Sequence, residues 1–233
     1  MFDINPPLLN SSNRWATTKQ ELHDLYHDTH TGAVTVRTAL LEGFVHDDLI
    51  HQHCFFNSDG KPLQDVSKDL EQPQQSTSTE VSSLNTLGYS PTPLLEYIMI
   101  IQEIEAERNV VGSSRRKPVI YSVTGDPQQI RQCHDLLVER VPSAGYWMME
   151  INLSCPNIPN KPPPAYSSPE LMKYLTLLQD CSDSVPIGLK ARLPSPFTGR
   201  KLTSTRYRLT HTKTNSTISS SPCGVSNPAL WPS

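Results

Sequence analysis

The chain has 233 residues, enough for one large domain or two small ones, and 36% of them are hydrophobic, which suffices for a buried core. A net charge of -3 and an isoelectric point near 6.2 leave no basic footprint for nucleic acid or for an anionic membrane surface. No apolar run approaches the roughly 20 residues that span a bilayer, and the N-terminus lacks the features of a signal peptide. We therefore expect a cytoplasmic protein that binds a small molecule.

Cysteine usage gives no sign of a disulfide framework. The chain has five cysteines, an odd number, and their spacing fits neither paired disulfides nor paired zinc ligands. We expect reduced thiols, and only Cys155 lies in a context that indicates chemistry. The five are Cys54, Cys133, Cys155, Cys181 and Cys223.

Four short runs rich in β-branched residues predict buried strands. They lack clean polar alternation, as parallel strands covered on both faces do. The runs are Gly32 to Thr38, Pro118 to Thr124, Tyr146 to Leu153 and Pro186 to Lys190.

Helical patterns lie between these strands. An early helix is predicted from about Thr18 to Tyr26. Asp126-Pro127 and Ser168-Pro169 each combine a side-chain acceptor at the N-cap with a proline at the first helical position. Two apolar stripes have helical spacing. One comprises Leu94, Leu95, Ile98, Ile101 and Ile104, and the other Leu171, Tyr174, Leu175 and Leu178.

The repeated order of strand and helix predicts an α/β fold with a parallel sheet, either a (β/α)8 or TIM barrel or an open doubly wound sheet. Periodicity does not choose between the two. A polar stretch near residues 57–83 is expected to form a mobile insertion. The pattern ends at about residue 190, and we expect the Ser/Thr-rich residues 191–233 to be a disordered tail outside domain 1–190. An abrupt change of this kind indicates a shifted reading frame, a retained intron or altered splicing.

The segment after the third predicted strand holds the strongest candidates for chemistry. Asn152, Cys155 and Asn157 follow the strand's carboxyl end, where barrel enzymes carry their active sites. A thiol, with an ordinary pKa of about 8.5, acts as a general base when its surroundings favour the thiolate. Neighbouring asparagines suit a planar, amide-rich ligand. The alternative is a buried cysteine at a proline-rich turn.

The stretch Met149 to Pro162, MEINLSCPNIPNKP, resembles the catalytic-base loop of soluble, fumarate-type (class 1) dihydroorotate dehydrogenases, with a fungal-like character. The resemblance implies a TIM barrel that binds FMN and oxidises dihydroorotate to orotate in pyrimidine (UMP) biosynthesis, with fumarate as acceptor. It assigns Cys155 as the base that removes the C5 proton while hydride passes from C6 to flavin N5. It also allows a homodimer.

Further positions follow from the same resemblance. The stretch Ser83 to Tyr89, SLNTLGY, matches the family's pyrimidine-contacting segment, and Arg37 stands where the family usually has a lysine, so a different substrate stays open. The substrate residues that the resemblance implies are Arg37, Asn85, Thr86, Leu87, Gly88, Tyr89, Asn152 and Asn157. The implied flavin contacts are Ser12, Arg37, Thr38, Asn152 and Lys190.

Plainer interpretations exist for each of these residues. Gly88 could simply make a turn, Arg37 could be a strand-end partner in a salt bridge, and Ser12 and Lys190 read alone are ordinary surface residues. A metal site at His46, His51 and His53 is disfavoured against a polar surface segment, because no second ligand cluster has suitable spacing. The basic run Arg115 to Lys117 is expected to be solvated.

The resemblance covers about residues 5 to 190, which predicts an incomplete barrel of about its first half to five-eighths. The glycine-rich loops that hold the FMN phosphate in the family do not appear in the sequence. An inactive fragment or interaction module of the family is therefore the alternative. A dihydropyrimidine dehydrogenase-type enzyme is a third hypothesis, but the NIPNKPPP continuation and the lack of iron-sulfur cysteine clusters argue against it.

Overall fold

The computed structural model describes residues 4–57, 60, 81–111, 116–142, 146–155, 157–158, 162–179, 181 and 185–191. The chain divides into Met1–Ala191 and Arg192–Ser233, and every described residue belongs to the first unit. The predicted tail, apart from Ala191, and the centre of the predicted insertion lie outside the described residues.

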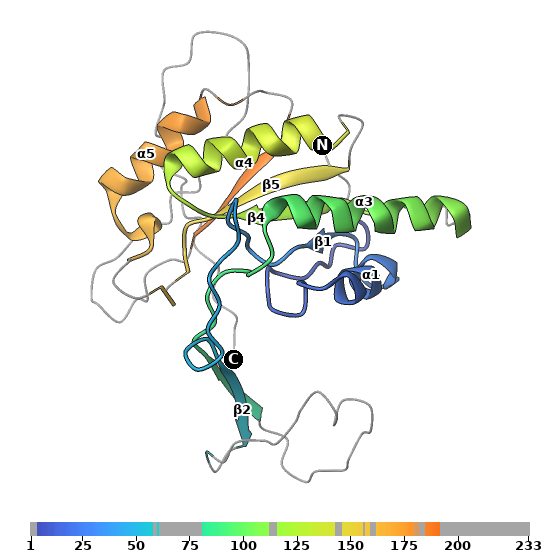
Figure 1. Ribbon diagram of the computed structural model, residues 1–233, viewed down its shortest axis with the longest axis horizontal. Coiled ribbons are helices and arrows are strands. Elements are labelled where there is room, and N and C mark those ends of the chain that lie inside the picture. The colour runs from blue at the N-terminus through green and yellow to red at the C-terminus, as the bar shows by residue number, and fades with distance from the viewer. Residues whose placement is uncertain are drawn as a thin grey trace, which may run out of the picture. The chain divides into compact units, whose positions relative to one another are not determined.

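A parallel sheet of four strands forms the centre of the described unit (Figure 1). Its strands are β1 (Val34–Thr35), β4 (Val119–Val123), β5 (Trp147–Asn152) and β6 (Ile187–Lys190), in the order β1-β4-β5-β6. All four predicted strands are therefore present, and the α/β class with a parallel sheet is confirmed. The described strands form an open sheet and do not close into a barrel.

Strand β1 is much shorter than the run Gly32 to Thr38 predicted, because other partners take its backbone groups. The Arg37 N–H donates to the Ala16 carbonyl at 2.9 Å, and the Thr38 N–H donates to Ser12 Oγ at 2.6 Å. The Ala39 N–H then returns to β4, where it donates to the Ser122 carbonyl at 2.9 Å. The chain thus stays alongside β4 while Arg37 and Thr38 reach the carboxyl end of the sheet.

The helices form one row in chain order over the sheet. The row comprises α1 (Lys19–His27), α3 (Leu94–Val111), α4 (Pro127–Arg140) and α5 (Ser168–Gln179), and each helix contacts the next. Figure 1 shows α3 and α4 side by side across the strands. A single 3-10 turn, η1 (Pro164–Tyr166), precedes α5. None of the helices among the described residues combines the length and apolar character needed to cross a bilayer.

Capping boxes fix two of the helix starts. At α1, the Thr18 side chain accepts the Glu21 N–H, and the Glu21 side chain accepts the Thr18 N–H. At α4, Asp126 and Gln129 form the same pair of hydrogen bonds. The start of α5 was predicted one residue too late. Ser168 is already helical, and the hydroxyl of the preceding serine accepts the Glu170 N–H at 3.5 Å.

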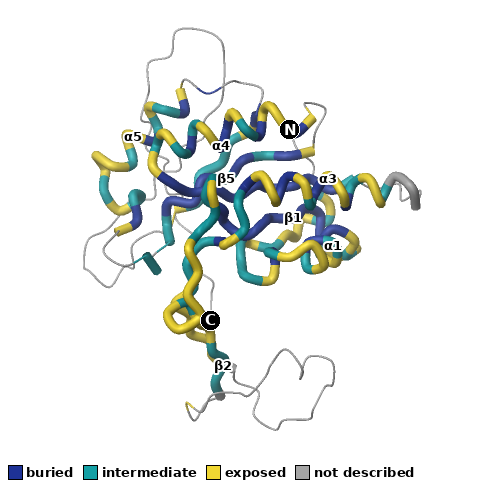
Figure 2. The backbone as a smooth tube through the Cα atoms, viewed as in Figure 1, coloured by how far each residue is buried: buried dark blue, intermediate teal, exposed yellow. Residues whose placement is uncertain are grey.

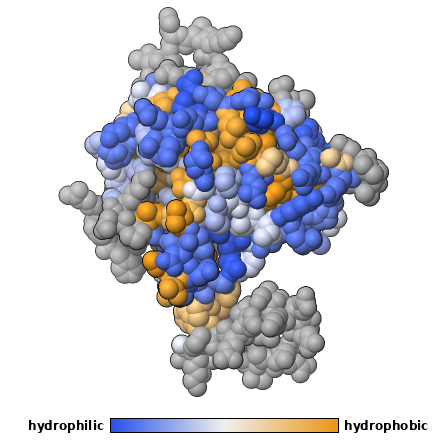
Figure 3. All heavy atoms as spheres, in the orientation of Figure 1, coloured by the Kyte–Doolittle hydropathy of each residue, from blue (hydrophilic) through white to orange (hydrophobic). Residues whose placement is uncertain are grey.

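The core lies between the sheet and the row of helices, where Figure 2 shows the buried strands. The apolar stripe of α3 is buried as predicted, except that Leu95 is exposed. Tyr97 is buried where Leu95 was expected, and its hydroxyl forms a hydrogen bond with Ser90 Oγ at 2.7 Å. Apolar atoms remain visible between polar regions near α3 and α4 in Figure 3, and Met99 and Val138 of these helices are exposed.

An antiparallel hairpin was missed by the sequence prediction. It pairs β2 (His53–Asn57) with β3 (Val81–Asn85), so both ends of the predicted insertion are strand. Thr86 ties the base of the hairpin, since its N–H donates to the Gln52 carbonyl at 2.9 Å and its hydroxyl accepts the Gln52 N–H at 3.0 Å. Cross-strand pairing between distant segments produces the hairpin, and periodicity does not reveal it.

The expectation of a solvated basic run is wrong for Lys117, which is 4% exposed. Its ammonium donates to the Leu25 carbonyl at 3.0 Å, to the Asp28 carbonyl and to Thr31 Oγ1 at 2.9 Å. These carbonyls lie at the C-terminal end of α1, where the helix dipole favours a cation. Arg116 forms an ion pair with Glu105 at 2.8 Å. Arg115 lies outside the described residues.

Candidate active site

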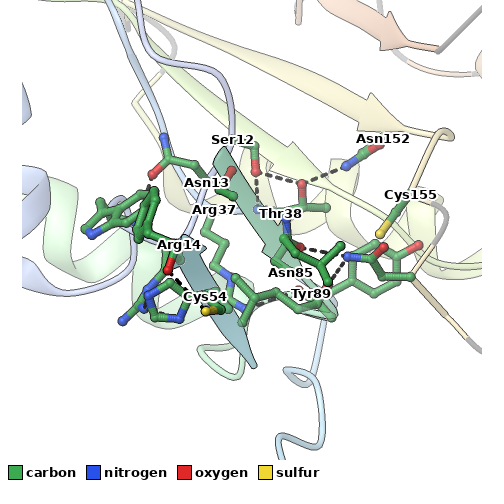
Figure 4. A pocket seen from close by; sticks show the side chains of 18 residues that line it. Ser12, Asn13, Arg14, Arg37, Thr38, Cys54, Asn85, Tyr89, Asn152 and Cys155 are labelled. Atoms are coloured by element: carbon green, nitrogen blue, oxygen red, sulfur yellow. Dashed lines mark hydrogen bonds between the residues drawn. The ribbon is translucent and has the colours of Figure 1, made fainter. Parts of the chain in front are cut away.

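A cavity of about 420 Å³ opens at the carboxyl ends of β1 and β5, with the β2–β3 hairpin as its other wall (Figure 4). Its volume is typical of a small-molecule site. The described residues that line it are Ser12, Asn13, Arg14, Trp15, Arg37, Thr38, His53, Cys54, Phe55, Ser83, Leu84, Asn85, Leu87, Gly88, Tyr89, Asn152, Cys155 and Asn157.

A chain of hydrogen bonds crosses the strand ends from the cavity wall to β6. Ser12 Oγ lies 2.8 Å from Thr38 Oγ1, which lies 2.9 Å from Ser122 Oγ. Ser122 Oγ donates to Glu150 Oε1 at 2.7 Å, and the same oxygen forms an ion pair with Lys190 Nζ at 3.0 Å.

Each hydroxyl has one hydrogen, which fixes the direction of this chain. Because Ser122 gives its hydrogen to the carboxylate, it must accept from Thr38. Thr38 in turn must accept from Ser12, whose Oγ already accepts the Thr38 N–H. The hydroxyl hydrogens of Ser12, Thr38 and Ser122 therefore all point along this row toward Glu150.

The side-chain amide of Asn152 is hydrogen-bonded to this row of hydroxyl groups. Its Nδ2 donates to Thr38 Oγ1 at 2.9 Å, while its Oδ1 accepts the N–H and hydroxyl of Ser154 at 3.2 and 3.1 Å. The amide is therefore fixed in orientation, and the same interactions fix the first turn of the loop that carries Cys155. The Cys155 side chain borders the cavity and is partly exposed.

Three hydrogen bonds tie the Ser83 to Tyr89 segment to the sheet side of the cavity. Asn157 Nδ2 donates to Asn85 Oδ1 at 2.9 Å and to the Leu87 carbonyl at 2.8 Å. Arg37 Nη2 donates to the Gly88 carbonyl at 3.1 Å. The loop after β5 and the chain after β1 thus both hold this segment in place.

Gly88 is needed for packing within the protein. A Cβ added there would lie 2.2 Å from Phe44 Cε1, well inside van der Waals contact. The same phenyl ring meets the Tyr89 ring edge-on, with centroids 5.8 Å apart. The absence of a side chain at Gly88 therefore lets Phe44 pack closely and support Tyr89.

The wall opposite Cys155 is cationic. The Arg14 guanidinium stacks over the Trp15 ring at 5.4 Å and contacts the ring nitrogens of His53. Burial, and then the charge of Arg14, lower the pKa of His53. Burial also lowers the pKa of Arg37. None of the described lining residues is Asp or Glu, so the cavity favours an anionic ligand.

The structure brings most of the predicted site residues together. Of these residues, Ser12, Arg37, Thr38, Asn85, Leu87, Gly88, Tyr89, Asn152, Cys155 and Asn157 line the cavity. Thr86 does not, because its side chain closes the base of the hairpin. Lys190 does not line it either, and reaches it only through Glu150 and the hydroxyl chain.

The sequence analysis assigned Ser12 of the first loop and Asn85 of the hairpin to the site, but not the other cavity residues of these two segments. Asn13, Arg14, Trp15, His53, Cys54, Phe55, Ser83 and Leu84 also line the cavity. The run His53 to Phe56, HCFF, contains aromatic residues typical of a strand and was the available signal.

No group of three His, Cys, Asp or Glu side chains comes together among the described residues. His46 Nε2 lies 3.1 Å from Asp48, and His51 Nδ1 accepts the Asp47 N–H at 2.9 Å. His53 faces Arg14 instead. The rings of His46 and His51 also contact each other, with centroids 5.3 Å apart, whereas His53 has a different partner.

No protein-family model and no curated protein matches the chain. The resemblance carried by the NLSCPN loop thus stays a prediction. The residues of the cavity are the basis for a functional hypothesis.

Proposed function

We propose that this chain is an FMN-dependent, dihydroorotate dehydrogenase-like oxidoreductase of the fumarate type, acting in the cytoplasm in pyrimidine biosynthesis. The observation that carries the proposal is the placement of Cys155 at a strand's carboxyl end, in one cavity with Asn85, Asn152 and Asn157. A thiol base beside several fixed amides is the donor set that a dihydropyrimidine requires.

The substrate of such an enzyme is an anion with an amide-like ring edge. Asn85 and Asn157 present amide groups to the cavity and suit the ring's N–H and C=O groups. Arg37 and Arg14 supply positive charge where no described lining residue carries a carboxylate, and they suit the carboxylate of dihydroorotate. Cys155 removes the proton from the ring carbon as a thiolate and becomes a thiol.

The residues present fit the polar edge of a flavin ring. Asn152 Nδ2 keeps a second N–H beyond the one it donates to Thr38, and Ser12 Oγ keeps one acceptor position. The Thr38 hydroxyl has no further capacity, and it fixes the direction of these two groups. Lys190, through its pair with Glu150, supplies a cation at the far end of the hydrogen-bond chain. When bound, FMN supplies the hydride acceptor. Among the described residues, no glycine-rich turn at a helix start offers a cradle for its phosphate.

The order of the elements supports a (β/α)8 barrel as the parent fold. Strands β1, β4, β5 and β6 are neighbours in chain order, and the helices form one row in the same order. A doubly wound sheet reverses its strand order at a switch point and puts helices on both faces. Neither feature occurs among the described elements, so they match consecutive units of an incomplete barrel.

A second candidate is a binding module of the same ancestry without turnover. It is favoured by one observation: the parallel sheet of the described residues has four strands, with β1 and β6 at its edges. Such a module would hold a pyrimidine or another chain but would not oxidise a substrate.

The purified full chain tests the proposal by its visible spectrum. A flavin band that bleaches when dihydroorotate is added without oxygen, and returns with fumarate, supports the enzyme. A colourless product after reconstitution with FMN rejects the enzyme for this chain. Bleaching by dihydrouracil in place of dihydroorotate would favour the dihydropyrimidine dehydrogenase type.

The role of Cys155 is tested by substitution. Cys155→Ala should slow bleaching by about 10²-fold to 10⁴-fold, the usual contribution of a general base, and leave flavin binding intact. Cys181→Ala is the control, because Cys181 is a buried thiol beyond α5 that does not line the cavity. Equal bleaching rates in the two variants would remove Cys155 from the mechanism.

A further inference from the structure

Ser12 and Asn152 offer the cavity one acceptor and one donor, side by side. Ser12 Oγ accepts the Thr38 N–H at 2.6 Å and gives its own hydrogen to Thr38 Oγ1 at 2.8 Å, so one acceptor position remains on it. Asn152 Nδ2 gives one N–H to the same Thr38 oxygen at 2.9 Å and keeps the other. Both residues line the cavity, and Figure 4 shows them on either side of Thr38.

The acceptor role of Ser12 is set at the far end of the hydrogen-bond chain. The carboxylate of Glu150, in its ion pair with Lys190 at 3.0 Å, only accepts, so Ser122 donates to it. Ser122 is 0% exposed, so water offers it no other partner, and its oxygen takes the Thr38 hydrogen. Thr38 is then left to accept from Ser12. Neither Ser122 nor Glu150 lines the cavity, so both act on Ser12 without touching a ligand.

A ligand that satisfies both groups carries an N–H for Ser12 next to a C=O for Asn152. This pair of groups is the edge of a cyclic amide. A ring with an oxygen in place of the N–H would bring two acceptors together at Ser12. A site built to bond an N–H discriminates against the analogue that lacks it, because its own polar group is left unpaired.

We propose that Ser122 and Glu150 are positioning residues that fix Ser12 as an acceptor, and that Ser12 and Asn152 together select ligands with a cyclic-amide edge. The inference deepens the proposed function and rests on it only for the binding of the ligand in this cavity. Dihydropyrimidines and the flavin ring both have such an edge. No covalent bond forms or breaks in this selection.

Two small anions that differ at one ring position test the selection. Pyroglutamate is a cyclic amide with a carboxylate on the carbon next to its N–H, and γ-carboxy-γ-butyrolactone has a ring oxygen in place of that N–H. Each carries one negative charge, so Arg14 and Arg37 attract both alike. NMR titration of the ligand signals with the flavin-free full chain gives the two dissociation constants.

The wild type should bind the amide about tenfold more tightly than the lactone, which is the contribution of one ordinary hydrogen bond. Equal affinities, or no binding of the amide, would overturn the proposal.

The remote role of Ser122 predicts a gain of binding. Without its hydroxyl, Thr38 can turn its hydrogen to Ser12, whose own hydrogen then faces the cavity. Ser122→Ala should therefore bind the lactone severalfold more tightly than the wild type does. The amide should keep its affinity, because the Ser12 hydrogen can still turn back to Thr38. A variant that merely damaged the site would bind both ligands more weakly.

Ser90→Ala is the matched control. Ser90 is also 0% exposed, its Oγ is hydrogen-bonded to the Tyr97 hydroxyl at 2.7 Å, and it does not line the cavity. This variant should keep the wild-type ratio of the two affinities. A Ser122→Ala ratio equal to that of Ser90→Ala would overturn the role of Ser122.

Glu150→Met is the second variant, and it decides the question if Ser122→Ala fails to fold. Methionine keeps the length of the side chain and removes the acceptor, so Ser122 can donate to Thr38 and all the hydroxyl hydrogens reverse. The lactone should again gain severalfold relative to the amide. The lost charge changes both affinities alike, because the two ligands carry the same charge. An unchanged ratio in this variant would also overturn the proposal.

Loading the full chain with FMN separates the two sources of the cyclic-amide edge. The preference for pyroglutamate disappears if the flavin ring occupies Ser12 and Asn152, and persists if the substrate does. If dihydroorotate is not oxidised but the preference exists and falls in Ser122→Ala, the proposed function fails and the inference stands. A flavin band that bleaches with dihydroorotate, together with equal affinities for the two anions, rejects the inference and supports the enzyme.

Discussion

Replacing Thr38 by valine tests the hydrogen-bond chain on which the site is built. Thr38 is 4% exposed, and its hydroxyl contacts Ser12, Ser122 and Asn152 at 2.8 to 2.9 Å. Valine keeps the branched shape and removes only the hydroxyl. The variant therefore isolates the contribution of the polar contacts from that of packing.

The expected loss of stability depends on how each partner is left after the change. The Asn152 N–H, in a residue 8% exposed, is left without its acceptor, which costs about 1–3 kcal/mol. Ser122 keeps its bond to Glu150 and loses only a donor, and Ser12 is partly exposed and can turn to water, so these two add about 1 kcal/mol together. The free energy of unfolding should fall by about 2–4 kcal/mol.

Urea unfolding of the full chain measures this loss. With a slope of about 2 kcal/mol per molar, the midpoint should fall by about 1–2 M. Thr38→Ser is the matched control, because it keeps the hydroxyl, deletes one methyl group and should cost about 1 kcal/mol. If valine costs no more than serine, the hydroxyl chain does not stabilise the strand ends and the reasoning fails.

Three further outcomes are expected. Gly88→Ala should destabilise the chain in urea, because its Cβ overlaps a phenyl ring, whereas Gly188→Ala, which meets open space, should not; equal effects would contradict this. Iodoacetamide at pH 8 should label Cys54 and spare Cys133, whose pKa burial raises to about 12, and peptide mass spectrometry would expose equal labelling. Asn157→Ala should speed amide exchange about tenfold in the segment it holds, and unchanged exchange would refute this tie.

Elements stabilised by local signals could be predicted from the sequence. The capping box that starts α4 at Pro127 lies within four residues, and β5 is a short run buried through most of its length. Both depend on interactions that a short window of sequence contains. The prediction of a parallel α/β sheet followed from their alternation.

Elements stabilised by distant partners could not be predicted. Strand β3, Val81–Asn85, is polar at three of its five positions and becomes a strand only by pairing with β2. The sequence predicts a solvated Lys117, but its ammonium binds carbonyl groups at the C-terminal end of α1, about 90 residues earlier in the chain. In both cases the deciding interaction lies far outside any window over which periodicity operates.

The cavity shows the same division and adds a physical constraint on the ligand. Sequence motifs located its thiol and amide side, because these residues follow strand ends. The cationic side forms only where the first loop meets the hairpin and brings Arg14 against His53. Burial and the charge of Arg14 both disfavour protonation of His53, and both lower its pKa. Among the described residues, a wall with Arg14 and Arg37 and no carboxylate is stabilised by an anion. The sequence indicated Arg37 alone, so Arg14 is the part of this charge selection that only the structure reveals.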